Sequence, residues 1–176
     1  MTDKRIFQLA SQFRKAIDIA FDKGCFEQRK PFCDFPYACC GLTSYLLARY
    51  LIEHNVQTLW ISNDREGWTH AWLVVNDQRV SIPRNRVTDM SEIADVLKSY
   101  GMKGSKVVNN NYSYKDIEKG LIIDITGDQF DDYDIPVYVG YMDDFHASFD
   151  YLGATDLSKE GYPCDEDIYS IISDFL

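Results

Sequence analysis

Hydrophobic positions recur at three- and four-residue steps in two stretches of the chain, and this spacing predicts two α-helices. The first helix is amphipathic and is predicted over residues 4–22. The second, over residues 40–54, is apolar around much of its circumference, which is typical of a central buried helix. A polar, proline-bearing loop at residues 24–37 separates the two and leads into the adjacent cysteines Cys39 and Cys40.

Shorter runs rich in β-branched and aromatic residues predict strands in the rest of the chain. These runs lie at residues 57–63, 69–75, 78–82, 121–126 and 135–140. Short turns join the first three runs, so we expect them to pair as antiparallel neighbours. Capping and periodicity signals predict further helices at residues 90–100 and 165–176. Helices followed by a mainly antiparallel sheet predict one α+β domain over residues 1–176, in which the second helix rests against the sheet.

Composition favours a globular protein, since 45% of the 176 residues are hydrophobic and 14% are aromatic. No apolar run approaches the roughly 20 residues that cross a bilayer. The first residues also lack the apolar stretch and cleavage site of a signal peptide. We therefore expect a cytoplasmic protein that does not bind membranes.

Charge narrows the partners further, because 28 acidic and 18 basic residues give a net charge of -10. Such a surface repels phosphate backbones, so we expect no nucleic-acid partner. Much of the acid lies late in the chain, in GDQFDDYD, MDDF and PCDEDIYSIISD. We expect these runs to form solvated faces rather than a docking patch.

The five cysteines form no C-x-x-C pair, and their odd number argues against a disulfide scaffold. Their spacing does not suit four convergent zinc ligands either, so we expect no metal site and keep structural zinc as the weakest alternative. Cys25, Cys33 and Cys164 are interpreted as small buried hydrophobic residues.

A cysteine at the start of the second helix is in a position that favours ionisation of its thiol. Unpaired N–H groups and the positive end of the helix dipole favour a thiolate there. Cys40 is the better candidate of the adjacent pair because the small Gly41 follows it and leaves room for a substrate carbonyl, although Cys39 stays possible from sequence. We interpret Cys40 as a candidate nucleophile.

A base and an acid follow in later strands. His70 lies in the apolar run THAWLVV, and Asp124 interrupts the aliphatic run LIIDIT, so each polar side chain needs a partner. A thiol, an imidazole and a carboxylate in this order predict a catalytic triad. Alone, His70 would be interpreted as a core histidine and Asp124 as a strand-end residue bonded to a turn.

Two other polar residues have weaker signals. Gln129 either supports a substrate or an oxyanion, or it belongs to a turn that ends a strand. His146, in DDFHASF, either flanks the site or lies on a loop, and the loop is the expected position.

These residues resemble the transglutaminase-like, papain-fold group of bacterial cysteine enzymes. The matching pattern is a proline-bearing loop, Cys40-Gly41 with Ser44 one helical turn later, His70-Ala71-Trp72-Leu73, and Ile123-Asp124-Ile125-Thr126 with Asp128-Gln129-Phe130. The resemblance covers about residues 35–130. It implies a papain-like fold with a triad of Cys40, His70 and Asp124.

One departure from the family leaves the acid open. The family joins the histidine and aspartate strands by a short hairpin, whereas residues 83–119 intervene here. Either this segment is an insertion or lid and Asp124 is the acid, or Asp77 in the first hairpin takes that role.

The resemblance implies thiol chemistry on an amide or acyl group, of the peptidase, protein deamidase, transglutaminase or acyltransferase type. A protein or peptide substrate is expected, and no cofactor is required. The alternative is a catalytically silent acidic binding or immunity-type module on the same scaffold. Substrate identity, hydrolysis versus transfer, the oxyanion-hole partner and oligomeric state stay open.

Overall fold

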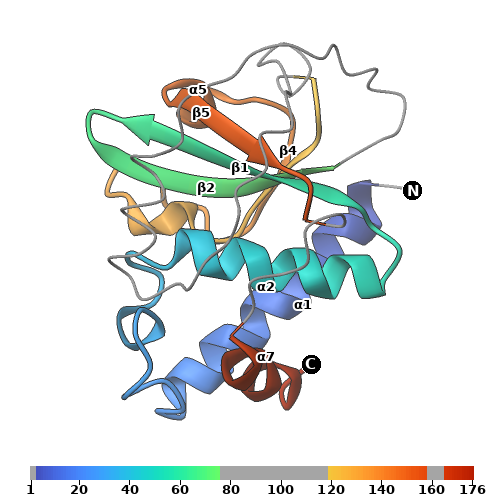
Figure 1. The fold of residues 1–176 in the computed structure, drawn as a ribbon, viewed down its shortest axis with the longest axis vertical. Helices are drawn as coiled ribbons and strands as arrows, with labels where there is room; N and C mark the ends of the chain where they lie inside the picture. Colours follow the sequence, from blue (N-terminus) through green and yellow to red (C-terminus); the bar gives the residue numbers. More distant parts are fainter. Residues whose placement is uncertain (1–2, 76–118, 158–164) are drawn as a thin grey trace.

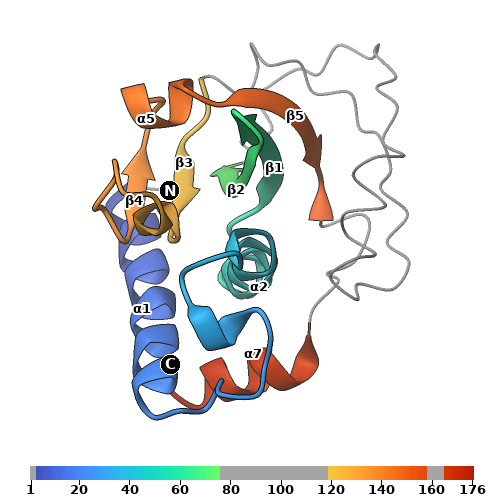
Figure 2. The same cartoon turned by 90° about the vertical axis from the view of Figure 1, so that its left-hand side faces the viewer.

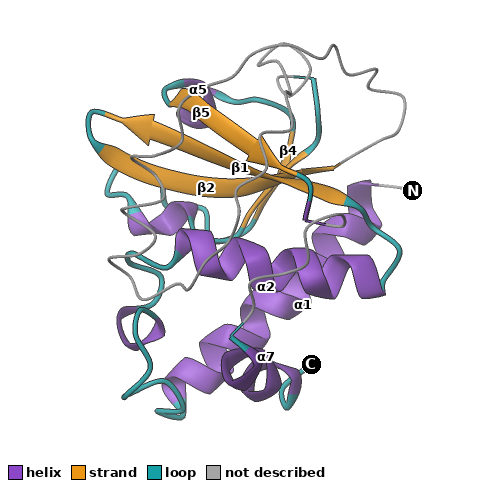
Figure 3. Cartoon of the chain, in the orientation of Figure 1, coloured by secondary structure: helices purple, strands orange, loops and turns teal. Residues whose placement is uncertain are grey.

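The computed structural model describes residues 3–75, 119–157 and 165–176. In these residues the protein has the predicted α+β architecture, with helices and one antiparallel sheet (Figure 1, Figure 3). The helices are α1 (Asp3–Asp22), α2 (Cys40–Glu53), α5 (Asp144–Ala147) and α7 (Glu166–Ser173), with 3₁₀ turns at Phe32–Asp34 and Gly127–Gln129. The strands are β1 (Thr58–Arg65), β2 (Trp68–Val75), β3 (Ile122–Asp124), β4 (Tyr138–Gly140) and β5 (Asp150–Thr155).

The first half of the chain follows the prediction closely. Both predicted helices and the hairpin of β1 and β2 are present, and β1 pairs antiparallel with β2 over its whole length. The sheet order is β4-β3-β2-β1-β5, so the hairpin forms its centre. Because β3 returns to pair with β2, residues far apart in the sequence meet at this point of the sheet.

The second half departs from the prediction. The strands expected over residues 121–126 and 135–140 are only Ile122–Asp124 and Tyr138–Gly140, and β5 and α5 were not predicted. The first shortening has a local cause: the Asp124 side chain accepts a hydrogen bond from the Thr126 N–H, which turns the chain away from the sheet. The predicted strand at 78–82, the helix at 90–100 and all but the last residue of the 83–119 segment lie outside the described residues.

The two faces of the sheet carry different layers (Figure 2). On one face α2 packs against β1 and β2, α1 runs beside α2 and also contacts β4, and α7 lies beneath α2. Their shared core contains fully buried side chains such as Phe13, Leu46 and Leu73. On the other face α5 and nearby aromatic residues form a smaller cluster around Trp72. None of the helices in the described part of the chain has the length and apolarity needed to cross a bilayer.

A buried arginine joins the first helix to the segment that follows β3. The apolar stripe of α1 includes Arg14, which is only 7% exposed. Its guanidinium makes a two-pronged ion pair with Asp128, at 2.9 and 2.7 Å. It also donates to the carbonyl oxygens of Ile125 and Pro136, at 2.7 and 3.0 Å. Arg14 thus satisfies the buried polar groups of this segment and fixes its path beside β3.

Replacing Arg14 should destabilise the protein far more than breaking an exposed ion pair. In Arg14→Met the methionine fills much of the space but leaves Asp128 without its partner, so we expect a loss of about 3–5 kcal/mol of unfolding free energy. The matched control is Arg29→Met, because Arg29 pairs with Asp167 at 3.4 Å with both side chains exposed; it should cost less than about 1 kcal/mol. Urea unfolding followed by circular dichroism measures both, and equal losses would contradict the role of Arg14.

Candidate functional site

The backbone places Cys40 as the first residue of α2, with Cys39 as the N-cap. Ala38, just before the cap, has a φ of 56°, a left-handed conformation that turns the chain sharply into the helix. The first intrahelical bond runs from the Thr43 N–H to the Cys39 carbonyl, at 2.8 Å. The N–H groups of residues 40–42 therefore have no intrahelical acceptor and form a positive end around the Cys40 thiol.

Two contacts set the register of α2 on β2. The Ser44 hydroxyl donates to the Ala71 carbonyl at 3.1 Å, and the Cys40 sulfur lies 4.0 Å from the Thr69 carbonyl oxygen. One helical turn from Cys40 to Ser44 rises about 6 Å. Two strand residues, from Thr69 to Ala71, advance about 6.7 Å. The helix and the strand therefore advance by nearly the same distance over this turn. This match holds the Cys40 thiol beside residues 69–71.

Strand pairing brings His70 and Asp124 onto one face of the sheet. Leu73 pairs with Ile123, so Trp72 lies opposite Asp124 and His70 is its diagonal neighbour. Alternation along each strand then directs both side chains away from α2. His70 Nε2 lies 2.7 Å from Asp124 Oδ2, with both residues 1% exposed. Because β3 ends at Asp124, the edge of β2 beside His70 is not covered by that strand, and the start of α2 reaches it.

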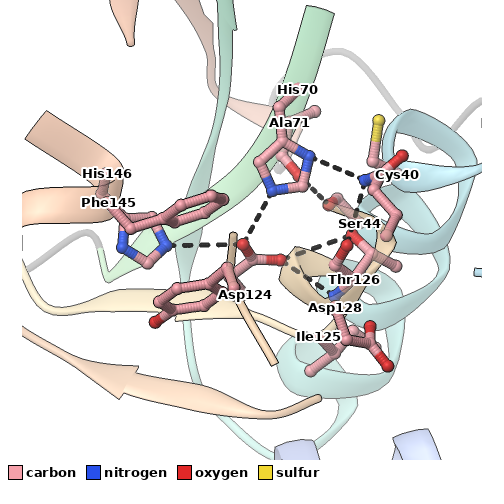
Figure 4. Close-up of polar contacts among 12 residues, drawn as sticks. Cys40, Ser44, His70, Ala71, Asp124, Ile125, Thr126, Asp128, Phe145 and His146 are labelled. Atoms are coloured by element: carbon pink, nitrogen blue, oxygen red, sulfur yellow. Dashed lines mark hydrogen bonds and ion pairs between the residues drawn. The ribbon is translucent and has the colours of Figure 1, made fainter. Parts of the chain in front are cut away.

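Figure 4 shows the ring of His70 between Asp124 and the start of α2, with one nitrogen turned to the carboxylate. Nε2 is engaged by Asp124, and Nδ1 lies on the side of the ring that faces the start of α2, where the Gln129 amide contacts it. The three predicted side chains thus come from α2, β2 and β3 and lie close together, with a direct contact between His70 and Asp124. Asp77, the alternative acid, lies outside the described residues.

Asp124 is held by its own turn as well as by His70. Its Oδ1 accepts hydrogen bonds from the N–H and hydroxyl of Thr126, at 2.9 and 3.3 Å. Gly127 lies so close that a Cβ there would be 3.1 Å from Asp124 Oδ2 and 2.7 Å from the Tyr133 ring. Only glycine fits this position without displacing a neighbour. Asp124 is therefore both a strand-end residue bonded to a turn and the partner of the histidine.

The ionisation of the three groups is coupled. Burial opposes charge on each of them, but the hydrogen bond and charge of His70 outweigh it for Cys40 and lower the pKa of the thiol below 9.0. For His70, burial is outweighed by the charge and hydrogen bond of Asp124 and by Cys40, which raise its pKa to about 10. For Asp124, burial is outweighed chiefly by the charge of His70, and its pKa falls well below the usual range. Near neutral pH these directions favour thiolate, imidazolium and carboxylate together.

Cys39 has the opposite environment. It is 1% exposed, its sulfur lies 3.0 Å from the Pro36 carbonyl oxygen, and burial raises its pKa to about 12. A thiol of this kind stays protonated and unreactive near neutral pH. The geometry therefore favours Cys40, which is partly exposed, over Cys39 as a nucleophile. Cys25 and Cys33 are partly exposed rather than fully buried, and Cys164 lies outside the described residues.

The Gln129 side chain contacts Nδ1 of His70, the ring nitrogen that does not bind Asp124. Its Nε2 lies 3.0 Å from His70 Nδ1 and donates to the Thr126 carbonyl at 3.0 Å. The residue belongs to the 3₁₀ turn after β3, as the turn interpretation expected, and it also lines the site. When His70 is neutral, the amide N–H of Gln129 donates to Nδ1 and leaves the Nε2 proton directed at Asp124.

Aromatic rings shield the histidine from water. The ring of His70 contacts Phe130, Phe145 and Phe149, with centroids 5.1, 6.2 and 5.6 Å away. The guanidinium of Arg65 covers the same three rings and makes a two-pronged ion pair with Asp132. A dry surrounding strengthens the pairing of His70 with Asp124.

His146 was expected on a loop, and this prediction is wrong. It lies in α5, is 1% exposed, and its Nε2 is 3.4 Å from Asp124 Oδ2 (Figure 4). The sequence carried a signal for this arrangement: Asp143 is a good N-cap residue three positions before His146, and apolar Phe145 and Phe149 are one turn apart. A capped turn with an apolar face predicts a short packed helix, which places its histidine inside.

Across residues 3–75, 119–157 and 165–176, no group of three or more His, Cys, Asp or Glu side chains has an arrangement that could hold a metal ion. The cluster of His70, Asp124 and His146 instead pairs nitrogen with oxygen atoms directly. Comparisons with protein-family models, curated proteins and solved structures find no match to this chain. The function is therefore inferred from the geometry of the site.

The pairing of His70 makes stability depend on pH in a defined direction. An unfolded histidine has a pKa of about 6.5, whereas the folded pKa of His70 is about 10. Because the folded pKa is raised, the stabilisation is complete below about pH 6.5 and is lost as the pH rises toward 10. The lowered pKa of the Cys40 thiol acts in the opposite direction below pH 9, so the comparison is made without that thiol. We expect the unfolding free energy of Cys40→Ala to fall over this interval more steeply than that of the double variant Cys40→Ala/His70→Gln.

Urea unfolding of both proteins at several pH values measures this difference. Comparing the two curves removes the contribution of tyrosines such as Tyr133, whose pKa is raised by burial and by its hydrogen bond to Asp143 in both proteins. Parallel curves between pH 6.5 and 10 would contradict the ion pair.

Proposed function

We propose that the protein is a cysteine-dependent enzyme that acts on amide or acyl groups, with Cys40 as nucleophile, His70 as base and Asp124 as the residue that orients the base. The observation that carries this proposal is the 2.7 Å contact of buried His70 with buried Asp124, next to a thiol at a helix N-terminus whose pKa is lowered. A buried carboxylate and imidazole beside a thiol that stays protonated would serve only the core.

The chemical steps follow from the roles of these groups. The Cys40 thiolate attacks the carbonyl carbon of the substrate, and a carbon–sulfur bond forms. The carbon–nitrogen bond then breaks, and the leaving amine takes the proton held on His70 Nδ1. Water or a second amine attacks the resulting thioester while His70 accepts its proton, and the carbon–sulfur bond breaks. Asp124 stays ionised and holds the imidazole in one orientation.

The start of α2 also supplies donors for the charge that develops on the carbonyl oxygen. The free N–H groups of residues 40–42 point out of the helix end beside the Cys40 thiol. Backbone donors of this kind stabilise a tetrahedral oxyanion. We assign the Cys40 N–H as one donor, and the Gln129 amide, which lies 3.0 Å from His70 Nδ1, as a candidate for a second.

The fold supports the same class of chemistry. A nucleophile helix packed on an antiparallel sheet, with histidine and aspartate on neighbouring strands, agrees with the expected papain-like or transglutaminase-like scaffold. We therefore extend the proposal to that scaffold and to its substrate class, a protein or peptide carboxamide. Hydrolysis and transfer share the thioester, so the first test addresses the thiol and the thioester.

Iodoacetamide should alkylate Cys40 at pH 6 much faster than free cysteine, because the lowered pKa of this thiol increases the fraction that is thiolate. Peptide mapping by mass spectrometry identifies the modified residue. Fast labelling should disappear in Cys40→Ala and persist in Cys39→Ala, the matched control for the adjacent thiol. Brief treatment with p-nitrophenyl acetate should also place one acetyl group on Cys40, and His70→Gln should slow both reactions by about 10²-fold or more.

A wild-type Cys40 that reacts no faster than free cysteine at pH 6 would overturn the enzymatic proposal. That result would favour the catalytically silent binding module, in which the same side chains only stabilise the fold. Fast labelling of Cys39 in place of Cys40 would assign the nucleophile to the other thiol.

A further inference from the structure

Beyond the three residues of the site, a second histidine and a second carboxylate continue the row of charged groups. His146 Nδ1 lies 2.6 Å from Asp143 Oδ1, and Tyr133 donates its hydroxyl proton to Asp143 Oδ2 at 3.0 Å. On its other side, His146 Nε2 lies 3.4 Å from Asp124 Oδ2, the oxygen that also binds His70. The side chain of His146 is fully buried, so these contacts replace water completely.

The two nitrogens of His146 have unequal contacts. Nδ1 has a short contact with Asp143, whereas Nε2 is buried and has no aligned hydrogen-bond acceptor. At 3.4 Å, Nε2 faces Asp124 Oδ2 without forming an aligned hydrogen bond. Both neighbours are carboxylates and accept only, so His146 suits both of them when each of its nitrogens carries a proton.

The position of His146 is fixed from several sides. Its backbone N–H also donates to Asp143 Oδ1, at 2.9 Å, so one carboxylate oxygen holds both the helix cap and the ring. The edge of its ring meets Trp72 of β2, and the rings of Tyr133 and Tyr138 lie against it. Among the described residues, the titratable groups that face His146 are thus Asp124, Asp143 and these two tyrosines.

We propose that His146, held by Asp143, is a positioning residue that keeps the Asp124 carboxylate ionised and directed at His70. This role rests on the proposed function and extends it, because His146 touches neither Cys40 nor its substrate. Imidazole and carboxylate groups alternate along the row, from His70 to Asp124, His146 and Asp143. With His146 in place, an imidazole ring separates the carboxylates of Asp124 and Asp143. Without it, the buried carboxylate of Asp124 and the partly buried carboxylate of Asp143 would face each other.

Loss of the contact between His146 and Asp124 should change the ionisation of the Cys40 thiol through its effect on His70. A less ionised or misdirected Asp124 stabilises the His70 cation less, and a weaker cation leaves more of Cys40 protonated. The readout is therefore the pH profile of Cys40 alkylation by iodoacetamide, which needs no knowledge of the natural substrate. A purely structural role for His146 would leave the midpoint of that profile in place.

Two replacements of nearly equal size separate the contacts of His146. The amide nitrogen of glutamine sits where Nε2 was and keeps a donor toward Asp124, whereas that of asparagine replaces Nδ1 and reaches only Asp143. In His146→Asn we expect alkylation at pH 6 to slow about tenfold, with the midpoint about one pH unit higher, as for the loss of one contact to a charged group. His146→Gln should stay within about threefold of the wild type, as one retained contact predicts.

A second pair of variants covers the case in which His146→Asn does not fold. Asp143→Asn keeps the helix cap but removes the charge that holds His146, and it should slow alkylation at pH 6 in the same direction. Its matched control is Asp144→Asn, because Asp144 is adjacent but exposed and should leave the rate unchanged. Thermal unfolding is recorded for every variant.

The outcomes are distinguishable. A fast wild type with a slow His146→Asn, a recovered His146→Gln and a slow Asp143→Asn supports the role of His146. A fast wild type with unshifted midpoints in both His146→Asn and Asp143→Asn overturns it and leaves the triad intact. Equal slowing of His146→Asn and His146→Gln, in step with lower thermal stability, also overturns it and assigns His146 to packing. A slow wild-type Cys40 overturns the proposed function itself.

Discussion

The structure around the candidate site depends on one buried carboxylate, that of Asp124. A carboxylate that is 1% exposed must find partners for its charge, and this one receives His70, the Thr126 N–H and hydroxyl, and His146. Each partner comes from a different part of the chain or fixes the local turn. The same requirement explains why Gly127 lies beneath it, where any side chain would collide with Asp124 or Tyr133.

Local patterns predicted the part of the fold in which local physics dominates. The periodicity of α1 and α2 and the β-branched and aromatic composition of β1 and β2 gave the correct elements, and the polar residues His70 and Asp124 stood out because they interrupt apolar strands. Their meeting could be expected from topology, since β3 pairs with β2. The sequence favoured Cys40 over Cys39 because Gly41 follows it. The burial of Cys39 and the partial exposure of Cys40 needed coordinates, because they depend on the turn at Ala38.

The ion pairs of the fold could not be predicted from the sequence, because they join segments that are distant along the chain. Arg14 in a helical stripe gave no sign of its partner Asp128, more than a hundred residues away. The acidic runs were expected to form solvated faces. This prediction is wrong for Asp128 and Asp143, whose partly buried carboxylates pair with Arg14 and His146. The papain-like assignment and the single-domain prediction over residues 1–176 stay predictions.

The contacts of Arg14 with the segment after β3 bear on when the environment of the Cys40 thiol is completed during synthesis and folding. Cys40 and His70 leave the ribosome early, but Asp124 is synthesised more than fifty residues after His70, and the segment that follows it is held against α1 by the contacts of Arg14 with Ile125, Asp128 and Pro136. A nascent chain therefore carries an ordinary thiol. The environment that lowers the pKa of Cys40 is complete only when the later strand has folded onto the earlier hairpin.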